Sequence, residues 1–373
     1  MSKDYINSVF FFIGTEAELI KVFPVILECK ISGLHTYIIA SGQNDIEKSS
    51  IFELTDIGNV DVKLSEESEI SKSAIGLMSW WIKTYLQAVK KIRLVLDEKQ
   101  LRNAFMVVHG DTVSTFMGAR IGHKLGMVVC HIEAGLRSHH LFNPFPEEID
   151  RLLTSRNARL HFAPGGEAVN NLKNVKGQVI NTQQNTLLDS LHISERFPVK
   201  DGKVKHIVGL PKPYFVFVMH RQENLANERF VRQVVDKIEE AAKNCHAIII
   251  LHTLTKNTFM KLGLIERLKS DRNVTLLPRV EYFDFMKLLQ NSDFVITDGG
   301  SNQEELYYMG KPTLIMRKNT ERNEGIGENA ILYNSVDDII SFSSHYNSYS
   351  REQHIKESPS MVVANKMIEY ANI

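Results

Sequence analysis

The chain has 373 residues, which is enough for two or three domains. Its 43% hydrophobic and 24% charged residues are typical of a folded protein and exclude a disordered or low-complexity chain. Lysine plus arginine and aspartate plus glutamate number 44 each, so the formal net charge is zero. This balance argues against a protein whose main role is to bind nucleic acid or an anionic membrane.

The apolar runs are all much shorter than the roughly 18 residues that span a bilayer, so we expect no membrane partner. Residues 1–4 lead directly into a strand-like run and do not have the pattern of a signal peptide. The three cysteines lie within apolar segments, which predicts buried thiols in a reducing compartment. Together these features predict a cytoplasmic protein.

Short runs rich in valine, isoleucine and phenylalanine alternate with amphipathic stretches along the chain. The runs show little polar–apolar alternation, which is typical of parallel strands that are buried on both faces. We expect strands at residues 8–13, 36–40, 104–109, 128–131, 214–218, 247–252, 274–277, 294–297 and 312–316. The amphipathic stretches predict helices over residues 78–98, 112–125, 226–243 and 258–269. This order predicts an α/β protein of the doubly wound type.

The alternation breaks off near residue 162 and restarts at residue 214, after a stretch rich in proline and glycine. We therefore predict two Rossmann-like lobes, residues 1–175 and 176–355. The remaining segment, residues 356–373, is expected to form a final helix. Ligands of such folds bind at the carboxyl ends of the strands, so we expect a deep cleft between two lobes to hold the ligand.

Three acidic side chains occupy positions of special interest in the first lobe. Asp111 and Glu133 each follow a predicted strand, and Glu147 opens a predicted helix. Each has a structural interpretation, such as Asp111 capping the next helix. Together with Arg137 and Arg151 they are expected on one wall of the cleft, where crowded carboxylates favour proton transfer. An acid–base site and purely structural roles, such as helix capping, are therefore both open interpretations of these side chains.

The second lobe has a different pattern. His220 follows a strand, where it suits contact with a phosphate or a leaving group, or packing within a loop. The turn Gly299-Gly300-Ser301 joins a strand to a helix, and its backbone N–H groups predict an anion site. Glu305, one helical turn further on, is a candidate ribose ligand or an exposed side chain.

No pair of histidines has the helical spacing of a zinc site, and the neighbours His139 and His140 are interpreted as a solvated loop pair. The sequence also lacks a nicotinamide-binding fingerprint. We therefore predict neither a metal nor a cofactor.

Six motifs follow one another in the order GDT, HIEAGLR, PFPEEIDR, MHRQEN, TDGGSNQEE and RKNTERNE. In this respect the chain resembles the UDP-N-acetylglucosamine 2-epimerase family over most of its length, and HxEAGLR followed by PEExxR is highly specific. The resemblance implies two Rossmann-like lobes as in GT-B glycosyltransferases, with a C-terminal helix that returns to the first lobe. It also implies a homodimer and a role in the biosynthesis of a surface polysaccharide.

The activity that the resemblance implies is the non-hydrolysing interconversion of UDP-GlcNAc and UDP-ManNAc. The C2 proton of the sugar has no adjacent carbonyl group to acidify it, so simple deprotonation is implausible. The family instead breaks the C1–O bond, so that UDP departs while a carboxylate removes the C2 proton. UDP then adds back to the resulting 2-acetamidoglucal, with a proton delivered to the other face.

Individual roles are carried over by motif. The resemblance implies that Asp111, Glu133 and Glu147 form the acid–base set and that His220 stabilises the departing UDP. The substrate-binding residues that it implies are Lys21, Arg137, Arg151, Phe285, Gly299, Gly300, Ser301, Glu305, Arg317, Thr320, Glu321 and Arg322.

The sequence also departs from the family. An arginine that helps to hold UDP in the family's first loop is Glu16 here, and the serine of the diphosphate turn TDSGG is lost or displaced by two. These changes keep alternatives open: a related UDP-sugar such as a uronate or deoxy sugar, a hydrolysing 2-epimerase that releases a free ManNAc-type sugar, or a GT-B-like glycosyltransferase or non-catalytic sugar-nucleotide binder.

Overall fold

The computed structural model describes residues 8–66, 74–139, 146–209, 213–318, 323–351 and 357–372, without the side chains of residues 74, 75 and 301. His140 and three predicted site residues, Thr320, Glu321 and Arg322, lie outside the described residues. The chain divides into two compact units, Met1–Ser190 together with Lys356–Ile373, and Leu191–Ile355.

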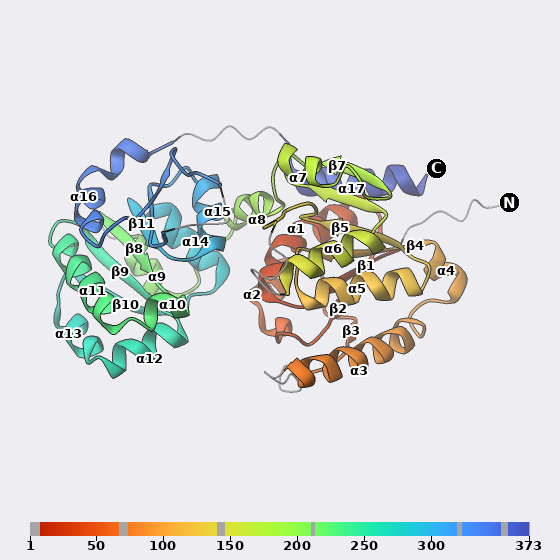
Figure 1. The fold of residues 1–373 in the computed structure, drawn as a ribbon, viewed down its shortest axis with the longest axis horizontal. Coiled ribbons are helices and arrows are strands. Elements are labelled where there is room, and N and C mark those ends of the chain that lie inside the picture. Colours follow the sequence, from red (N-terminus) through yellow and green to blue (C-terminus); the bar gives the residue numbers. More distant parts are fainter. Residues whose placement is uncertain are drawn as a thin grey trace. The chain divides into compact units, whose positions relative to one another are not determined.

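The described part of the first unit contains a sheet of seven parallel strands in the order β3-β2-β1-β4-β5-β6-β7 (Figure 1). Its strands are β1 (Ser8–Ile13), β2 (His35–Ala40), β3 (Val62–Lys63), β4 (Ala104–His109), β5 (Val128–Ile132), β6 (Leu160–Ala163) and β7 (Gln178–Asn181). The helices are α1 (Glu16–Ile31), α2 (Ser50–Leu54), α3 (Ala74–Ile92), α4 (Glu98–Arg102), α5 (Val113–Lys124), α6 (Glu147–Asn157), α7 (Gly166–Asn171) and the start of α8 (Leu187–Ser194), with a 3₁₀ turn at Ile46–Lys48.

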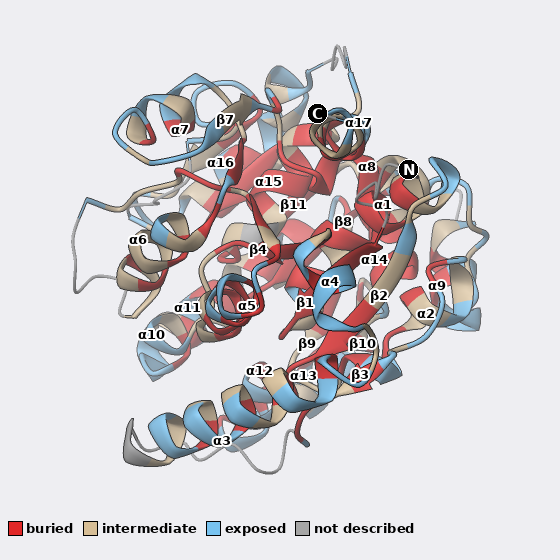
Figure 2. Ribbon diagram, turned by 90° about the vertical axis from the view of Figure 1, so that its right-hand side faces the viewer, coloured by how far each residue is buried: buried red, intermediate tan, exposed pale blue. Residues whose placement is uncertain are grey.

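Helices cover both faces of this sheet. Phe10 and Phe12 of β1 share a buried cluster with Trp80 of α3 and Met117 of α5. Phe11, which lies between them, points to the opposite face, where α1 packs against β1. In Figure 2 the strands β1 and β4 are accordingly buried, whereas much of α3 is exposed. This double coverage explains why the strands are almost uniformly apolar.

The C-terminal helix α17 (Pro359–Ala371) belongs to the first unit, although it follows the second unit in the sequence. It packs against α1, and the backbone N–H of Ser360 donates a 2.7 Å hydrogen bond to the carboxylate of Asp189. Near its other end, the ring of Tyr370 lies edge-on to Phe105, with 6.1 Å between the ring centroids.

The first unit extends to residue 190, beyond the expected boundary at residue 175. The reason is that β7 pairs with β6 in the first sheet, with Phe162 opposite Ile180. The hydroxyl of Thr186, at the start of α8, then donates a 2.5 Å hydrogen bond to the backbone carbonyl of Lys21 in α1.

The described part of the second unit contains a sheet of six parallel strands in the order β10-β9-β8-β11-β12-β13. Its strands are β8 (Tyr214–Val218), β9 (His246–Leu251), β10 (Val274–Pro278), β11 (Phe294–Thr297), β12 (Thr313–Ile315) and β13 (Ala330–Leu332). The helices are α9 (Gly202–Val208), α10 (Gln222–Leu225), α11 (Glu228–Ala242), α12 (Thr253–Lys261), α13 (Leu264–Ser270), α14 (Tyr282–Asn291), α15 (Gly300–Tyr308) and α16 (Asp338–His345), followed by a 3₁₀ turn at Tyr346–Tyr349. The predicted fold class, α/β with two parallel sheets, is confirmed.

Two predicted helices differ from those observed. The helix predicted over residues 258–269 is divided between α12 and α13, because Gly263 adopts a left-handed conformation with φ of 70°. The helix predicted over residues 78–98 ends at Ile92, and α4 begins after Asp97, whose side chain accepts from the backbone N–H of Gln100. Both differences follow from local capping and turn chemistry that apolar periodicity does not detect.

Among the described residues, no helix is both long enough and apolar enough to cross a bilayer. The cysteines Cys29, Cys130 and Cys245 are buried free thiols, as predicted. Burial raises the pKa of the Cys245 thiol to about 12, which makes it unreactive at neutral pH.

Candidate active site

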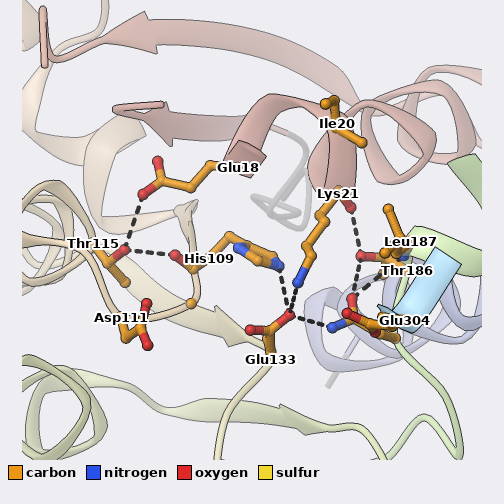
Figure 3. A network of polar contacts seen from close by, with 12 residues as sticks. Glu18, Ile20, Lys21, His109, Asp111, Thr115, Glu133, Thr186, Leu187 and Glu304 are labelled. Carbon is orange, nitrogen blue, oxygen red and sulfur yellow. Dashed lines mark hydrogen bonds and ion pairs between the residues drawn. The ribbon is translucent and has the colours of Figure 1, made fainter. Parts of the chain in front are cut away.

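Asp111 and Glu133 follow two neighbouring strands at the same edge of the first sheet. His109, the last residue of β4, lies opposite Ile132, the last residue of β5, in the parallel register. The backbone N–H of Gly110 donates a 3.0 Å hydrogen bond to the carbonyl of Ile132. The chain therefore leaves both strands side by side, and Figure 3 shows the two carboxylates near this edge.

The carboxylate of Glu133 is buried and bound by several polar groups. The Lys21 ammonium and the Asn185 side-chain amide both contact its Oε2 atom, and Nε2 of His109 lies 3.5 Å from the same atom (Figure 3). Glu133 has a φ of 62°, a left-handed conformation that costs a non-glycine residue about 1 kcal/mol or more. A strained backbone and a buried ion pair together hold this carboxylate in one place.

Glu18 fixes the start of α1, the helix that carries Lys21. Its Oε2 atom accepts from the backbone N–H groups of Gly14 (2.6 Å) and Thr15 (3.3 Å), and Oε1 accepts from the hydroxyl of Thr112 (2.5 Å). Burial raises the pKa of Glu18, although these hydrogen bonds act against the increase. Because Thr112 caps α5 directly after Asp111, Glu18 links the start of α1, the helix that carries Lys21, to the loop that carries Asp111.

Asp111 belongs to a second network of charges, built mainly on α6. Arg151 of α6 pairs with Asp111 and lies 3.6 Å from the carboxylate of Glu148, one turn earlier. Glu148 is fully buried and also accepts from Arg137 (2.5 Å) and the backbone N–H of Ser138 (3.0 Å). Burial acts to raise the pKa of Glu148, but the Ser138 N–H and the two arginines outweigh it, so the pKa is lowered. The network holds Asp111 and Arg151 in fixed positions.

Two further carboxyl groups of α6 face this network. Glu147, the first residue of the helix, has a buried Oε2 atom with no hydrogen-bond partner among the described residues. Asp150 lies one turn later with 6% of its surface exposed, and its Oδ2 atom is likewise unpartnered. Burial, together with the charges of Asp111 and Glu147, raises the pKa of Asp150 to about 7. The site thus contains a carboxyl group that holds a proton near neutral pH, as general acid–base chemistry requires.

In the second unit, Asp298 organises the loop that carries His220. Asp298 is fully buried at the end of β11, and its carboxylate accepts from the backbone N–H groups of His220 (2.9 Å) and Arg221 (3.0 Å). The amide of Asn224 donates a third bond of 3.0 Å, and Nδ1 of His220 lies 3.4 Å away. These contacts leave the imidazole of His220 partly exposed at the carboxyl end of β8.

The ring of His220 lies next to both Gly299 and His252. A Cβ atom at Gly299 would lie 2.8 Å from Cε1 of His220, so a larger residue there displaces the imidazole. The ring also lies 5.1 Å from that of His252, measured between centroids. Burial and the neighbouring His220 lower the pKa of His252 to about 4. The imidazole of His252 is therefore neutral at neutral pH.

The remaining predicted residues of the second unit lie at several places. Gly299 and Gly300 form the start of α15, and Glu305, one turn further on, is buried and accepts from Asn302 (3.1 Å). Phe285 lies half-buried in α14, and Arg317 follows β12. The backbone of Ser301 is helical, but its side chain is outside the described residues. Across the described residues, no three His, Cys, Asp or Glu side chains gather as metal ligands.

The sequence model of the family described as UDP-N-acetylglucosamine 2-epimerase matches residues 28–355. The chain belongs to this epimerase family. A UDP-N-acetylglucosamine 2-epimerase of Methanococcus maripaludis is 30% identical over 354 residues, which cover 90% of this chain and 92% of the relative. The UDP-2,3-diacetamido-2,3-dideoxy-D-glucuronate 2-epimerase of Pseudomonas aeruginosa is 31% identical over 66% of this chain and 68% of its own length.

Solved structures of this epimerase family share the fold. The Methanocaldococcus jannaschii UDP-GlcNAc 2-epimerase, in complex with UDP-GlcNAc and UDP, is similar with a TM-score of 0.71 and 26% identity. The similarity covers 97% of this chain and 99% of that one. The fold is therefore GT-B-like, and the protein is an isomerase of the UDP-N-acetylglucosamine 2-epimerase type.

The side chains of the first unit's site that sequence reasoning missed include Asn185, Glu18 and Asp150. Asn185, which binds Glu133, follows β7, a short strand with exposed ends that has no apolar run to reveal it. Glu18 had a visible signal, because Thr15-x-x-Glu18 is a capping box. Asp150 had none, since its burial depends on how α6 packs against α5.

Proposed function

We propose that the protein interconverts UDP-GlcNAc, or a closely related UDP-sugar, and its C2 epimer. The observation that carries this proposal is the pairing of two acidic side chains with cations at adjacent strand ends, Glu133 with Lys21 and Asp111 with Arg151. Each cation holds its carboxylate in place through an ion pair. Family membership supports the same chemistry.

The proposed reaction begins with cleavage of the bond between C1 and the UDP oxygen. UDP leaves with the electron pair, a carboxylate takes the C2 proton, and the C1–C2 double bond of 2-acetamidoglucal forms. In the return step a carboxyl group delivers a proton to the opposite face of C2 while UDP adds to C1. We assign these proton transfers to Asp111, Glu133 and Glu147. The raised pKa of the neighbouring Asp150 places one more carboxyl group that holds a proton near neutral pH beside Asp111 and Glu147.

For the second unit we propose nucleotide binding. The start of α15 presents backbone N–H groups at Gly299 and Gly300, which suit the UDP diphosphate. His220, partly exposed and fixed by Asp298, is proposed to stabilise the leaving UDP. Glu305 is proposed to accept from ribose hydroxyls. The roles of Phe285 and Arg317, and of Thr320, Glu321 and Arg322 outside the described residues, stay predictions, as does the homodimer.

The test is incubation with UDP-GlcNAc in heavy water, followed by NMR. The proposal predicts solvent deuterium at C2 of intact UDP-sugar and the appearance of UDP-ManNAc. Asp111→Asn and Glu133→Gln should each abolish the exchange, whereas Glu98→Gln, at an exposed position of the same unit, should not. Free ManNAc with UDP would instead indicate a hydrolysing enzyme. Absence of both exchange and release with every UDP-HexNAc offered would refute the proposal.

The substrate is a narrower question. The similarity to the Pseudomonas aeruginosa diacetamido-uronate epimerase favours a second candidate, a UDP-linked 2,3-diacetamido uronate. A parallel incubation with UDP-2,3-diacetamido-2,3-dideoxyglucuronate decides between them by the ratio of the two kcat/KM values.

A further inference from the structure

His131 is a buried histidine within β5, with 1% of its surface exposed. Its Nε2 atom lies 2.8 Å from the backbone carbonyl oxygen of Gly110. Because a carbonyl oxygen only accepts, Nε2 carries the proton and the ring is the donor. Burial lowers the pKa of His131 to about 3, which keeps the ring neutral and its tautomer constant across the physiological range.

The hydrogen bond acts on the turn that leads from β4 to Asp111. Gly110 has a φ of 71°, a left-handed conformation that glycine adopts without cost. Its carbonyl group and the N–H of Asp111 belong to one planar peptide unit, so fixing the carbonyl oxygen fixes the direction in which Asp111 begins. The N–H of Gly110 is bound in turn by the carbonyl of Ile132. Both sides of Gly110 are thus attached to the two residues that precede Glu133.

We propose that His131 is a positioning residue, whose Nε2–H group fixes the Gly110–Asp111 peptide and thereby sets Asp111 relative to Glu133. The side chain itself touches neither carboxylate through a hydrogen bond. Its effect on turnover rests on the proposed function, in which Asp111 and Glu133 act on one substrate, whereas its effect on the turn does not.

The neighbouring strand provides a matched control. His161 of β6 lies directly opposite His131 in the register, and it too is fully buried. Its Nε2 atom lies 3.0 Å from the backbone carbonyl of Lys176. Lys176 precedes β7, at the amino-terminal edge of the sheet, whereas Gly110 lies at the carboxyl edge. The two histidines therefore make the same bond in the same core, and only His131 makes it beside Asp111.

The experiment compares four variants: His131→Leu, His131→Gln, His161→Leu and His161→Gln. Leucine fills the space without a donor, and glutamine can place an amide N–H near the position of Nε2. We expect His131→Leu to lower kcat by about 100-fold with little change in KM, as for a misplacement of about 1 Å. His131→Gln should keep kcat within about fivefold of the wild type, a residual loss that corresponds to about one hydrogen bond. Both His161 variants should keep the wild-type kcat.

Hydrogen–deuterium exchange gives a readout that does not depend on activity. The peptide covering residues 110–112 should exchange faster in His131→Leu than in His161→Leu, when both are compared at equal distance below their melting temperatures. Equal exchange in the two leucine variants would overturn the proposal, as would equal kcat values. If the wild type fails to epimerise any UDP-sugar, the proposed function fails, and the exchange comparison alone still decides whether His131 holds the turn.

Discussion

Replacing Lys21 by methionine removes the cation from Glu133 and leaves the carboxylate in a buried environment. The two side chains retain only 8% and 7% of their exposed surface, so the solvent compensates little for the lost partner. Breaking a buried ion pair in this way costs about 3–5 kcal/mol of folding free energy. The amide of Asn185 still donates to Glu133, which offsets about 1 kcal/mol. We therefore expect Lys21→Met to lower the free energy of unfolding by about 3 kcal/mol at pH 8.

The loss should be smaller at pH 5. In the variant, a buried carboxylate without its cation binds a proton more tightly in the folded state than in the unfolded chain. Stability is then gained as the pH falls and lost as it rises, the opposite of a carboxylate held in an ion pair. The double variant Lys21→Met/Glu133→Gln carries neither charge. It should therefore be more stable than Lys21→Met at pH 8 and lack the pH dependence that Glu133 causes in that single variant.

Urea unfolding followed by tryptophan fluorescence measures this in the relevant unit. The two tryptophans of the chain, Trp80 and Trp81, both lie in α3 of the first unit. Their emission therefore reports the unfolding of the unit that contains Lys21. A loss below about 1 kcal/mol at pH 8, the value of an exposed pair, would refute the reasoning. An equal loss at pH 5 and pH 8 would refute the part that concerns the charge.

Three further variants test other parts of the account. Asp150→Asn should be more stable than the wild type by up to about 4 kcal/mol at pH 8 and equal to it near pH 4. The reason is that the pKa of Asp150 in the folded state, about 7, lies above that in the unfolded chain, so the aspartate destabilises the fold as the pH rises. Urea unfolding that shows no gain in stability at pH 8 would contradict this. Asp298→Asn loses an acceptor for the His220 loop and should weaken UDP binding by about 5- to 160-fold, which corresponds to a cost of about 1–3 kcal/mol. Unchanged affinity in calorimetry would argue against the loop's role. Glu16→Arg changes the local charge by two units and should tighten UDP binding by about 1 kcal/mol, with Glu16→Gln intermediate. Unchanged or weaker binding in calorimetry would count against a repulsive role for Glu16.

The strands were largely predictable from the sequence. The bounds of β1, β4, β8 and β11 agree with the expected ones, because each is a continuous apolar run, and all but β8 end at a glycine or polar residue. Short edge strands such as β7 were not, because a strand with exposed residues at both ends has no apolar run. The pairing of β7 with β6 also accounts for the extent of the first unit to Ser190, beyond the predicted residue 175.

The site was predictable only in part. Asp111 and Glu133 could be placed together because parallel strands present their carboxyl ends at one edge. The pairing of Lys21 with Glu133 joins residues 112 positions apart, and only the packing of α1 against the sheet determines it. The environment of Asp150 likewise depends on tertiary packing, because its position in α6 alone does not distinguish a buried acid from an exposed one.

The central claim is that the C1–O bond of the UDP-sugar breaks and re-forms during each exchange at C2. Its most direct test is UDP-GlcNAc that carries oxygen-18 in the bridge between C1 and the β-phosphorus, incubated in heavy water and followed by phosphorus and proton NMR. We predict that the label moves into the non-bridging oxygens of the β-phosphate while deuterium enters C2. Deuterium at C2 with the label still wholly in the bridge would contradict the account.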